Sequence, residues 1–281
     1  MTHKKTILRN IRLSGAGVHS GKPVKLTLLP SEAGEIVFRR MDLGNLEARI
    51  DPGRVESFNS TTLVGDEFNV RTVEHLLASL FAFGVNSLVV EIDADEIPIM
   101  DGSARPFVLA LEKAGTRRLA QKIPSLKILR PFAVEDKGAS VIVEPSETGA
   151  GLWLSYAIDY ANPAIGLRRF ERRFTLASFA REIAPARTFG FVRDVETLRC
   201  QGLALGASLE NTVVLDDAGV MNGPLRFPDE FVRHKLLDLA GDLALLGRPL
   251  IGRFTACKAG HRLHLLAVRF ILEHPGFWTE A

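Results

Sequence analysis

The chain is poor in cysteine, with Cys200 and Cys257 as the only two among 281 residues. They form no closely spaced pair of the kind that binds zinc, so any zinc must be held by histidine and carboxylate side chains. Two isolated cysteines also fit a reducing compartment. No apolar run approaches the roughly 20 residues of a membrane span, and the N-terminus lacks an apolar segment of signal-peptide length. We therefore expect a cytoplasmic protein without stable membrane insertion.

A strong charge of one sign is also lacking, because the net charge is only +2. No stripe of lysine and arginine with interleaved aromatics is present, which argues against a nucleic-acid partner. The basic run at 168–173 is broken by Glu171 and is expected to be a solvated strand. With 46% hydrophobic and 24% charged residues, the composition is that of one large or two medium globular domains.

Residues 230–242, E-F-V-R-H-K-L-L-D-L-A-G-D, carry the clearest chemical signal. On a helix, His234, Asp238 and Asp242 lie at i, i+4 and i+8 and project from nearly one face. An imidazole and a carboxylate one turn apart can bind one metal ion, and the second carboxylate can orient a neighbouring group. Buried charges are costly unless they are paired or bound to metal. The segment alone also fits an amphipathic helix with a solvated polar stripe.

Two further segments contribute candidate site residues. Thr72 is predicted to cap a helix that runs to Phe83, with Glu74 and His75 in its first turn, where the helix dipole favours a carboxylate. This pair suits a general base next to a metal ligand, but it also fits a surface pair. The segment C-K-A-G-H, residues 257–261, puts His261 on a glycine turn after an apolar strand, where a solvated loop residue is the alternative.

Seven segments, in this order, give the chain a family resemblance that extends nearly from end to end. They are S-G-A-G-V-H-S-G-K at 14–22, T-V-E-H-L at 72–76, E-I-P-I-M-D-G-S-A at 96–104, A-R-T-F-G-F at 186–191, G-L-A-L-G-A-S-L-E-N at 202–211, F-V-R-H-K-L-L-D at 231–238 and K-A-G-H at 258–261. Together they resemble the zinc-dependent UDP-3-O-acyl-N-acetylglucosamine deacetylases of lipid A biosynthesis.

The sequence pattern predicts an α+β fold, because strands followed by helices occur in both halves. Strands are expected near 24–29, 34–39, 87–92, 126–135, 139–144, 151–159, 212–216 and 250–256, and helices near 72–83, 105–114, 176–183, 229–246 and 261–273. Residues 121–125 are polar and contain a proline, so we predict a linker there. The resemblance implies two similar sandwiched α/β domains, 1–122 and 126–281. Each would carry an inserted element, with the active site at the domain interface.

The resemblance implies hydrolysis of an amide, removing acetate from UDP-3-O-acyl-N-acetylglucosamine in the committed step of lipid A biosynthesis. One catalytic Zn²⁺ would be bound by His75, His234 and Asp238, leaving a position for water. Zinc would lower the pKa of that water and polarise the amide carbonyl. The same three ligands would also accept iron or cobalt.

Four more residues match catalytic positions of the family. Glu74 would take the proton of the water as general base, and His261 would donate a proton to the leaving amine. Asp242 would hold His261 charged and oriented. Thr188 would donate a hydrogen bond to the oxyanion of the tetrahedral intermediate.

The resemblance also implies substrate contacts. Lys235 would reach sugar or phosphate oxygens as a compact cation, and Lys258 would face the diphosphate. Tyr160 would pack on the uracil and Phe189 against the sugar, although plain core packing is an equal alternative for both aromatic residues.

An insert at about 192–216 would form a passage for the acyl chain, in which each buried CH₂ is worth about 0.8 kcal/mol. Its expected lining residues are Val195, Leu198, Gly206, Ala207, Ser208 and Val214. The composition alone equally fits a packed β-α-β unit with glycine turns.

Two other motifs are interpreted as structural. The glycine-rich segment 14–22 is not a phosphate loop, because Pro23 follows Lys22 and no helix comes next. We expect a tight turn between strands, with His19 as a candidate neighbour of the site. Asp101 lies in a turn before a helix, where a capping role is favoured over positioning site residues.

Departures from the family leave alternatives open. The family commonly has asparagine where this chain has His264, and Lys137 is only the nearest candidate for a basic residue that the family uses. A catalytically silent homologue that senses a UDP-sugar or acyl ligand is one alternative, although a sensor would not need both acid–base groups. A zinc amidase acting on a related substrate is another. We expect a monomer.

Overall fold

Two sheets and the helices between them make up most of the computed structural model, which describes residues 1–146 and 151–281. The first sheet has five strands in the order β2-β3-β9-β4-β5. Their bounds are Ile11–Ala16 for β2, Pro23–Pro30 for β3, Leu88–Ile92 for β9, Ile36–Arg40 for β4 and Leu46–Arg49 for β5. Neighbouring strands are antiparallel except β4 and β9, which run parallel. Val24, Leu26 and Leu28 alternate along β3 and are all buried, so this sheet turns one face to the core.

The second sheet is built on the long strand β18 (Leu250–Cys257). Five of its strands lie in the order β12-β13-β18-β11-β19. The bounds of the other four are Phe132–Asp136 for β12, Ala139–Glu144 for β13, Leu126–Ile128 for β11 and Trp278–Glu280 for β19. Strand β14 (Leu152–Asp159) runs parallel to β18, and β15 (Leu167–Phe174) pairs with β14. Strand β18 is an interior strand, because residues 253–257 pair with β13 on one side and with β14 on the other. It runs antiparallel to β13 and parallel to β14 and β11.

Smaller elements complete the chain. Three minor sheets pair β1 (Thr2–Ile7) with β10 (Thr116–Ile123), β6 (Val55–Ser57) with β7 (Thr61–Val64) and β8 (Asn69–Val70), and β16 (Phe189–Phe191) with β17 (Val213–Leu215). The α-helices are α1 (Glu74–Phe83), α2 (Arg105–Ala114), α3 (Leu176–Ser178), α4 (Val192–Cys200), α5 (Glu230–Leu243) and α6 (His261–Glu273). A π-helical turn at Phe179–Ile183 extends α3, and 3₁₀ turns lie at Met41–Leu43, Pro52–Arg54, Ala244–Leu246 and Pro275–Phe277.

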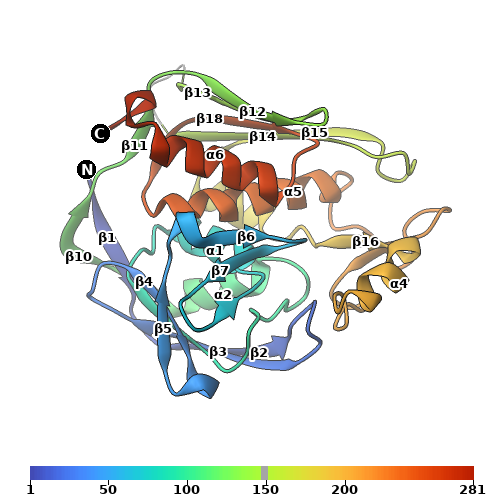
Figure 1. The fold of residues 1–281 in the computed structure, drawn as a ribbon, viewed down its shortest axis with the longest axis horizontal. Helices are drawn as coiled ribbons and strands as arrows, with labels where there is room; N and C mark the ends of the chain where they lie inside the picture. The colour runs from blue at the N-terminus through green and yellow to red at the C-terminus, as the bar shows by residue number, and fades with distance from the viewer. Residues whose placement is uncertain (147–150) are drawn as a thin grey trace.

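The helices form the middle of a layered molecule (Figure 1). Helices α5 and α6 lie against the second sheet, and α1 packs on α5 from the side of the first sheet. Nearly every residue of α1 and α5 is buried, which is expected for helices covered on both sides. Helix α4 and strand β16 project at one edge of the molecule (Figure 1).

The mixture of sheets and helices confirms the predicted α+β class. Helices α2 and α6 have the predicted bounds. The predicted cap at Thr72 is wrong, because α1 begins at Glu74 and the Thr72 hydroxyl instead donates to Glu96. The predicted linker is also partly wrong, since β10 extends to Ile123 through its pairing with β1.

Two other predictions need adjustment. The single strand expected at 126–135 is two strands, β11 and β12, separated at residues 129–131, where Pro131 cannot donate to a ladder. Asp101 does not cap α2, and its carboxylate accepts from Ser103 and Arg226. Within residues 1–146 and 151–281, no helix is long and apolar enough to cross a membrane.

The start of α1 lies directly against α5 at Gly241. A Cβ atom at position 241 would lie 2.2 Å from the Glu74 carbonyl oxygen and 2.8 Å from the Glu74 Cα. A side chain there would therefore require one helix backbone to move. The glycine lets Glu74 and His75 approach the face of α5 that carries His234 and Asp238.

We predict that Gly241→Ala lowers the free energy of unfolding by about 1–3 kcal/mol, because the methyl group forces the two helices apart. Chemical denaturation of both proteins measures this difference. Gly276→Ala is the matched control, since a Cβ at position 276 meets no atom within 4 Å. Equal stability of the two variants would show that the crossing of α1 and α5 tolerates a methyl group.

Candidate active site

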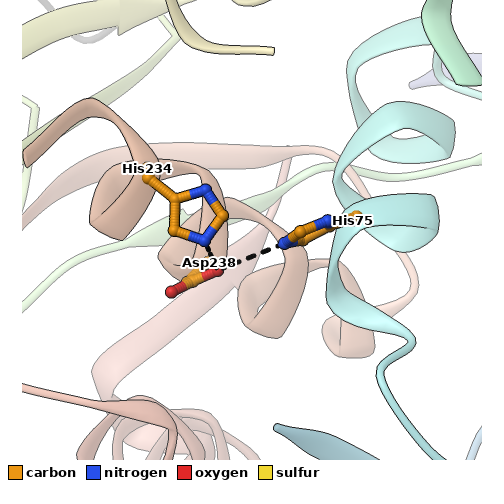
Figure 2. Close-up of side chains that lie close together, drawn as sticks. All are labelled: His75, His234 and Asp238. Atoms are coloured by element: carbon orange, nitrogen blue, oxygen red, sulfur yellow. Dashed lines mark ion pairs between the residues drawn. The ribbon is translucent and has the colours of Figure 1, made fainter. Parts of the chain in front are cut away.

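Two imidazoles and a carboxylate converge where α1 meets α5. The Nε2 atoms of His75 and His234 lie 3.8 Å and 3.5 Å from Asp238 Oδ1 (Figure 2). The three candidate ligand atoms lie within 4.8 Å of one another, and all three residues are buried. His75 comes from α1, and the other two come from successive turns of α5 (Figure 2). These separations exceed hydrogen-bond length, so the atoms face one another without bonding.

The protonation states of this group suit a metal site. Burial lowers the pKa of His75 to about 3, and it also lowers the pKa of His234. The Nδ1 atom of His234 lies 3.1 Å from the Ala186 carbonyl oxygen and donates to it, which leaves Nε2 as an electron-pair donor. Two neutral imidazoles and one carboxylate are the ligand types that zinc takes in catalytic sites. The donor set therefore fits a divalent metal.

Lys235 keeps the Asp238 carboxylate ionised. Burial raises the pKa of Asp238, but the attraction of Lys235 and the nearby histidines outweighs it, and the net pKa is far below its usual range. The Lys235 ammonium donates to Asp238 Oδ2 at 2.7 Å, on the oxygen that does not face His75 and His234. The lysine thus orients the carboxylate while its other oxygen stays available.

A second polar group lies one helical turn further along α5. Asp242 Oδ2 is 2.7 Å from Nδ1 of both His261 and His264, and its Oδ1 accepts from the Thr61 hydroxyl at 2.5 Å. Asp242, His261 and His264 also lie close enough together to be metal ligands. The Nδ1 atoms of both histidines are engaged in 2.7 Å hydrogen bonds to the carboxylate, however, so the His75 group is the better candidate for a metal and this group is a candidate for proton chemistry.

Glu74 and His261 are a candidate base and a candidate acid, and the pKa of each is raised by a different cause. Burial raises the pKa of Glu74 to about 7 against the attraction of His261. Burial alone would lower the pKa of His261, but Asp242, Glu74 and Asp238 raise it to about 9. The Nε2 atom of His261 lies 3.9 Å from both Glu74 Oε1 and Asp238 Oδ2. Near neutral pH, a charged imidazole and a carboxyl group that titrates in this range therefore stand side by side.

Both groups open into one cavity of about 930 Å³. Its lining includes Glu74, His75, His234, Lys235, Asp238 and His261. Of the other predicted site residues, it includes Thr188, Phe189, Tyr160, Val195, Leu198, Ala207, Ser208 and Val214. The predicted catalytic, metal and aromatic residues are therefore brought together, and Asp242 lies fully buried behind His261.

Three predicted residues lie elsewhere. Lys258 is on the surface, bonded to Asp159 at 2.6 Å, and is not part of the cavity lining. Lys137 lies in the exposed turn between β12 and β13. Gly206 packs against the loop between β2 and β3, where its Cβ would lie 2.2 Å from the Gly17 carbonyl oxygen. His19 of that same loop does line the cavity.

Several site residues have no clear signal in the sequence. Thr61 comes from β7 and lies outside all seven segments that carry the family resemblance. Arg262 lines the cavity next to His261 and is paired with Asp136. His264, which departs from the family pattern, bonds to Asp242 and also lies 3.1 Å from the Tyr156 hydroxyl.

These features define the class of protein: an α+β fold in which a group of residues that could hold a metal ion shares one large cavity with Glu74 and His261, whose pKa values are shifted toward use as a base and an acid. The family model for UDP-3-O-acyl N-acetylglycosamine deacetylase, LpxC, matches residues 4–273. The chain belongs to this family, which confirms the resemblance drawn from the seven sequence segments.

Similar proteins agree with this assignment. The chain is 42% identical over 275 residues to the UDP-3-O-acyl-N-acetylglucosamine deacetylase of Thermodesulfovibrio yellowstonii, covering 97% of this chain and 93% of the relative. It is 42% identical over 288 residues to the Chromobacterium violaceum protein of the same name, covering 100% and 94%. The Nautilia profundicola protein of that name is 40% identical over 276 residues, covering 98% and 93%.

We predict that His234→Ala loses the bound metal, because only two of the three ligands remain. His264→Ala should keep it, since His264 belongs to the hydrogen-bonded group around Asp242. Elemental analysis of the purified variants gives the metal content per chain and the identity of the ion. The assignment fails if His234→Ala keeps the wild-type content or if His264→Ala loses it.

Proposed function

We propose that this protein is a zinc-dependent amide hydrolase that removes acetate from UDP-3-O-acyl-N-acetylglucosamine, the committed step of lipid A biosynthesis. Membership of the deacetylase family and the names of its relatives support this substrate. The observation that carries the proposal is the shared cavity, in which the His75, His234 and Asp238 group adjoins Glu74 and His261.

The candidate metal ligands and the acid–base pair come from both halves of the chain. Glu74 and His75 come from α1, whereas His234, Asp238 and His261 come from α5 and α6. This supports the further proposal that residues 1–122 and 126–281 are two similar domains with the active site between them.

Each residue then has a defined task. Zinc held by His75, His234 and Asp238 would supply Lewis-acid activation of the water and the amide carbonyl. Glu74 takes a proton from the attacking water, and its raised pKa suits a base that works near neutral pH. Thr188 donates to the developing oxyanion.

The leaving amine requires an acid. His261 meets this need because the Asp242 carboxylate at 2.7 Å keeps its imidazole protonated and fixes its orientation. Its Nε2 faces the same space as Glu74 Oε1, 3.9 Å away, so base and acid act on one reacting centre. Proton removal from the water and proton delivery to the amine are thereby assigned to different groups.

The cavity also offers contacts for the rest of the substrate. Tyr160 packs edge-on against Phe189, with ring centroids 5.8 Å apart, and both line the cavity. We assign the uracil to Tyr160 and the sugar to Phe189 and Lys235, with Lys258 reaching the diphosphate from the surface. The acyl chain is assigned to the side lined by Val195, Leu198, Ala207, Ser208 and Val214, with Gly206 supporting it from behind.

The direct test measures acetate release from UDP-3-O-acyl-N-acetylglucosamine by the zinc-loaded protein. Turnover that requires the UDP group supports the proposal. Binding without turnover would instead indicate a sensor, and equal turnover of an amide without UDP would indicate a broader zinc amidase.

We predict a bell-shaped dependence of kcat/KM on pH. The rate should rise as Glu74 loses its proton and fall at higher pH as His261 loses its proton, because the base must be free and the acid charged. Glu74→Gln should lower the rate by roughly 10² to 10⁴-fold and remove the rising limb. Near-normal activity of Glu74→Gln would exclude Glu74 as the base.

We predict that Ala207→Phe impairs substrates with long acyl chains more than those with short ones. The ring would block the passage, and each excluded CH₂ costs up to about 0.8 kcal/mol. The measurement is kcat/KM over a series of acyl lengths. Ala207 is preferred to Gly206, where a side chain would collide with the Gly17 backbone.

The exposed strand residue Ala133 provides the control, as Ala133→Phe, because it lies outside the cavity lining. This variant should behave like wild type at every acyl length. Equal losses for Ala207→Phe at all lengths, with the fold intact, would mean that the acyl chain binds elsewhere.

A further inference from the structure

One threonine from the first half of the chain contacts all three residues of the proposed proton chemistry. Thr61 is the first residue of β7 and is fully buried. Its backbone N–H donates to Glu74 Oε2 at 3.0 Å, and its hydroxyl donates to Asp242 Oδ1 at 2.5 Å. The same hydroxyl oxygen lies 3.1 Å from His261 Nδ1. These partners belong to α1, α5 and α6, so a single residue ties three helices together.

The donors and acceptors fix the direction of each bond. An ionised carboxylate only accepts, so the single hydroxyl proton of Thr61 must point to Asp242. The oxygen of Thr61 then keeps lone pairs that can accept from the His261 Nδ1–H, which also points to Asp242 Oδ2 at 2.7 Å. The hydroxyl therefore fits the ion pair formed by Asp242 and a protonated His261.

The two oxygens of Asp242 have different sets of donors. His261 and His264 share Oδ2, whereas Oδ1 receives the hydroxyl of Thr61. Without that hydroxyl, the carboxylate would lose its hydrogen bond from β7 and could rotate away from the imidazoles. A buried acceptor that loses its partner is costly, so the carboxylate would be expected to reorient.

We propose that Thr61 is a positioning residue: its hydroxyl holds Asp242 and His261 in place, and its N–H holds Glu74, so that acid and base stay aligned. This inference rests on the reaction proposed above. Thr61 touches no reacting atom itself and acts through the groups that do. A strand of the first half would thereby set the geometry of an acid carried by the second.

The test replaces the hydroxyl while keeping the shape of the side chain. Thr61→Val removes the O–H but keeps the backbone N–H to Glu74, and Thr61→Ser keeps the O–H but removes the methyl group. We expect Thr61→Val to lower kcat by about tenfold to 10²-fold, as for a reacting group displaced by up to about 1 Å. KM and zinc content should not change, since only transition-state contacts are lost. Thr61→Ser should keep most of the activity.

Thr62→Val is the matched control. Thr62 is the next residue of β7 and is also buried, but strand alternation turns its side chain to the opposite face, and it does not line the cavity. It should retain wild-type kcat. If Thr61→Val does not fold, kcat is compared between Thr61→Ser and Thr61→Ala. These two variants differ only by one hydroxyl, so the loss in Thr61→Ala relative to Thr61→Ser measures its effect.

A second readout does not depend on turnover. The short, charge-assisted bond from His261 Nδ1–H to Asp242 should give a downfield, slowly exchanging imidazole proton in the NMR spectrum of the zinc-loaded protein. This resonance should shift or broaden in Thr61→Val and persist in Thr61→Ser and Thr62→Val.

The outcomes separate the two proposals. Wild-type kcat and an unchanged resonance in Thr61→Val would overturn the positioning role, as would equal impairment of Thr61→Ser and Thr61→Val. If the wild-type protein releases no acetate, the proposed function fails, and the resonance alone decides whether Thr61 positions the Asp242–His261 pair.

Discussion

The close crossing of α1 and α5 at Gly241 is the constraint on which the site depends. Because position 241 has no Cβ, the Glu74 backbone can approach α5 to a distance that any side chain would prevent. This contact carries His75 and Glu74 to the face of α5 that holds His234 and Asp238. It also buries them, and burial is the largest single influence on the pKa of His75 and Glu74. One backbone contact therefore sets both the geometry and the electrostatics.

A charged partner at hydrogen-bond distance decides whether removal from water lowers the pKa of a histidine in this site. His75 is buried and His261 is largely shielded from solvent, yet the pKa of the first is about 3 and that of the second about 9. His261 has the Asp242 carboxylate at 2.7 Å, whereas His75 has its closest carboxylate oxygen at 3.8 Å, shared with His234. Desolvation thus leaves one imidazole as a neutral ligand, while the ion pair keeps the other as an acid.

Local sequence signals failed where a distant segment changed the environment. Thr72 has the residue type of a helix cap, but the buried Glu96 carboxylate takes its hydroxyl instead. Residues 121–123 look like a linker by composition, yet pairing with β1 makes them part of a strand. In each case the competing partner lies more than 20 positions away in the chain, so no local pattern could reveal it.

The sequence by itself determined the α+β class, the long buried helix and the spacing of His234, Asp238 and Asp242 on one face, because helical periodicity is a local property. It also determined family membership, through seven ordered segments. Only the tertiary structure decided that His75 meets the α5 pair, that Thr61 and His264 bond to Asp242, and that Arg262, not Lys258, lines the cavity. These contacts join segments separated by up to 181 residues. They depend on how sheets and helices pack, which the residues of one segment do not specify.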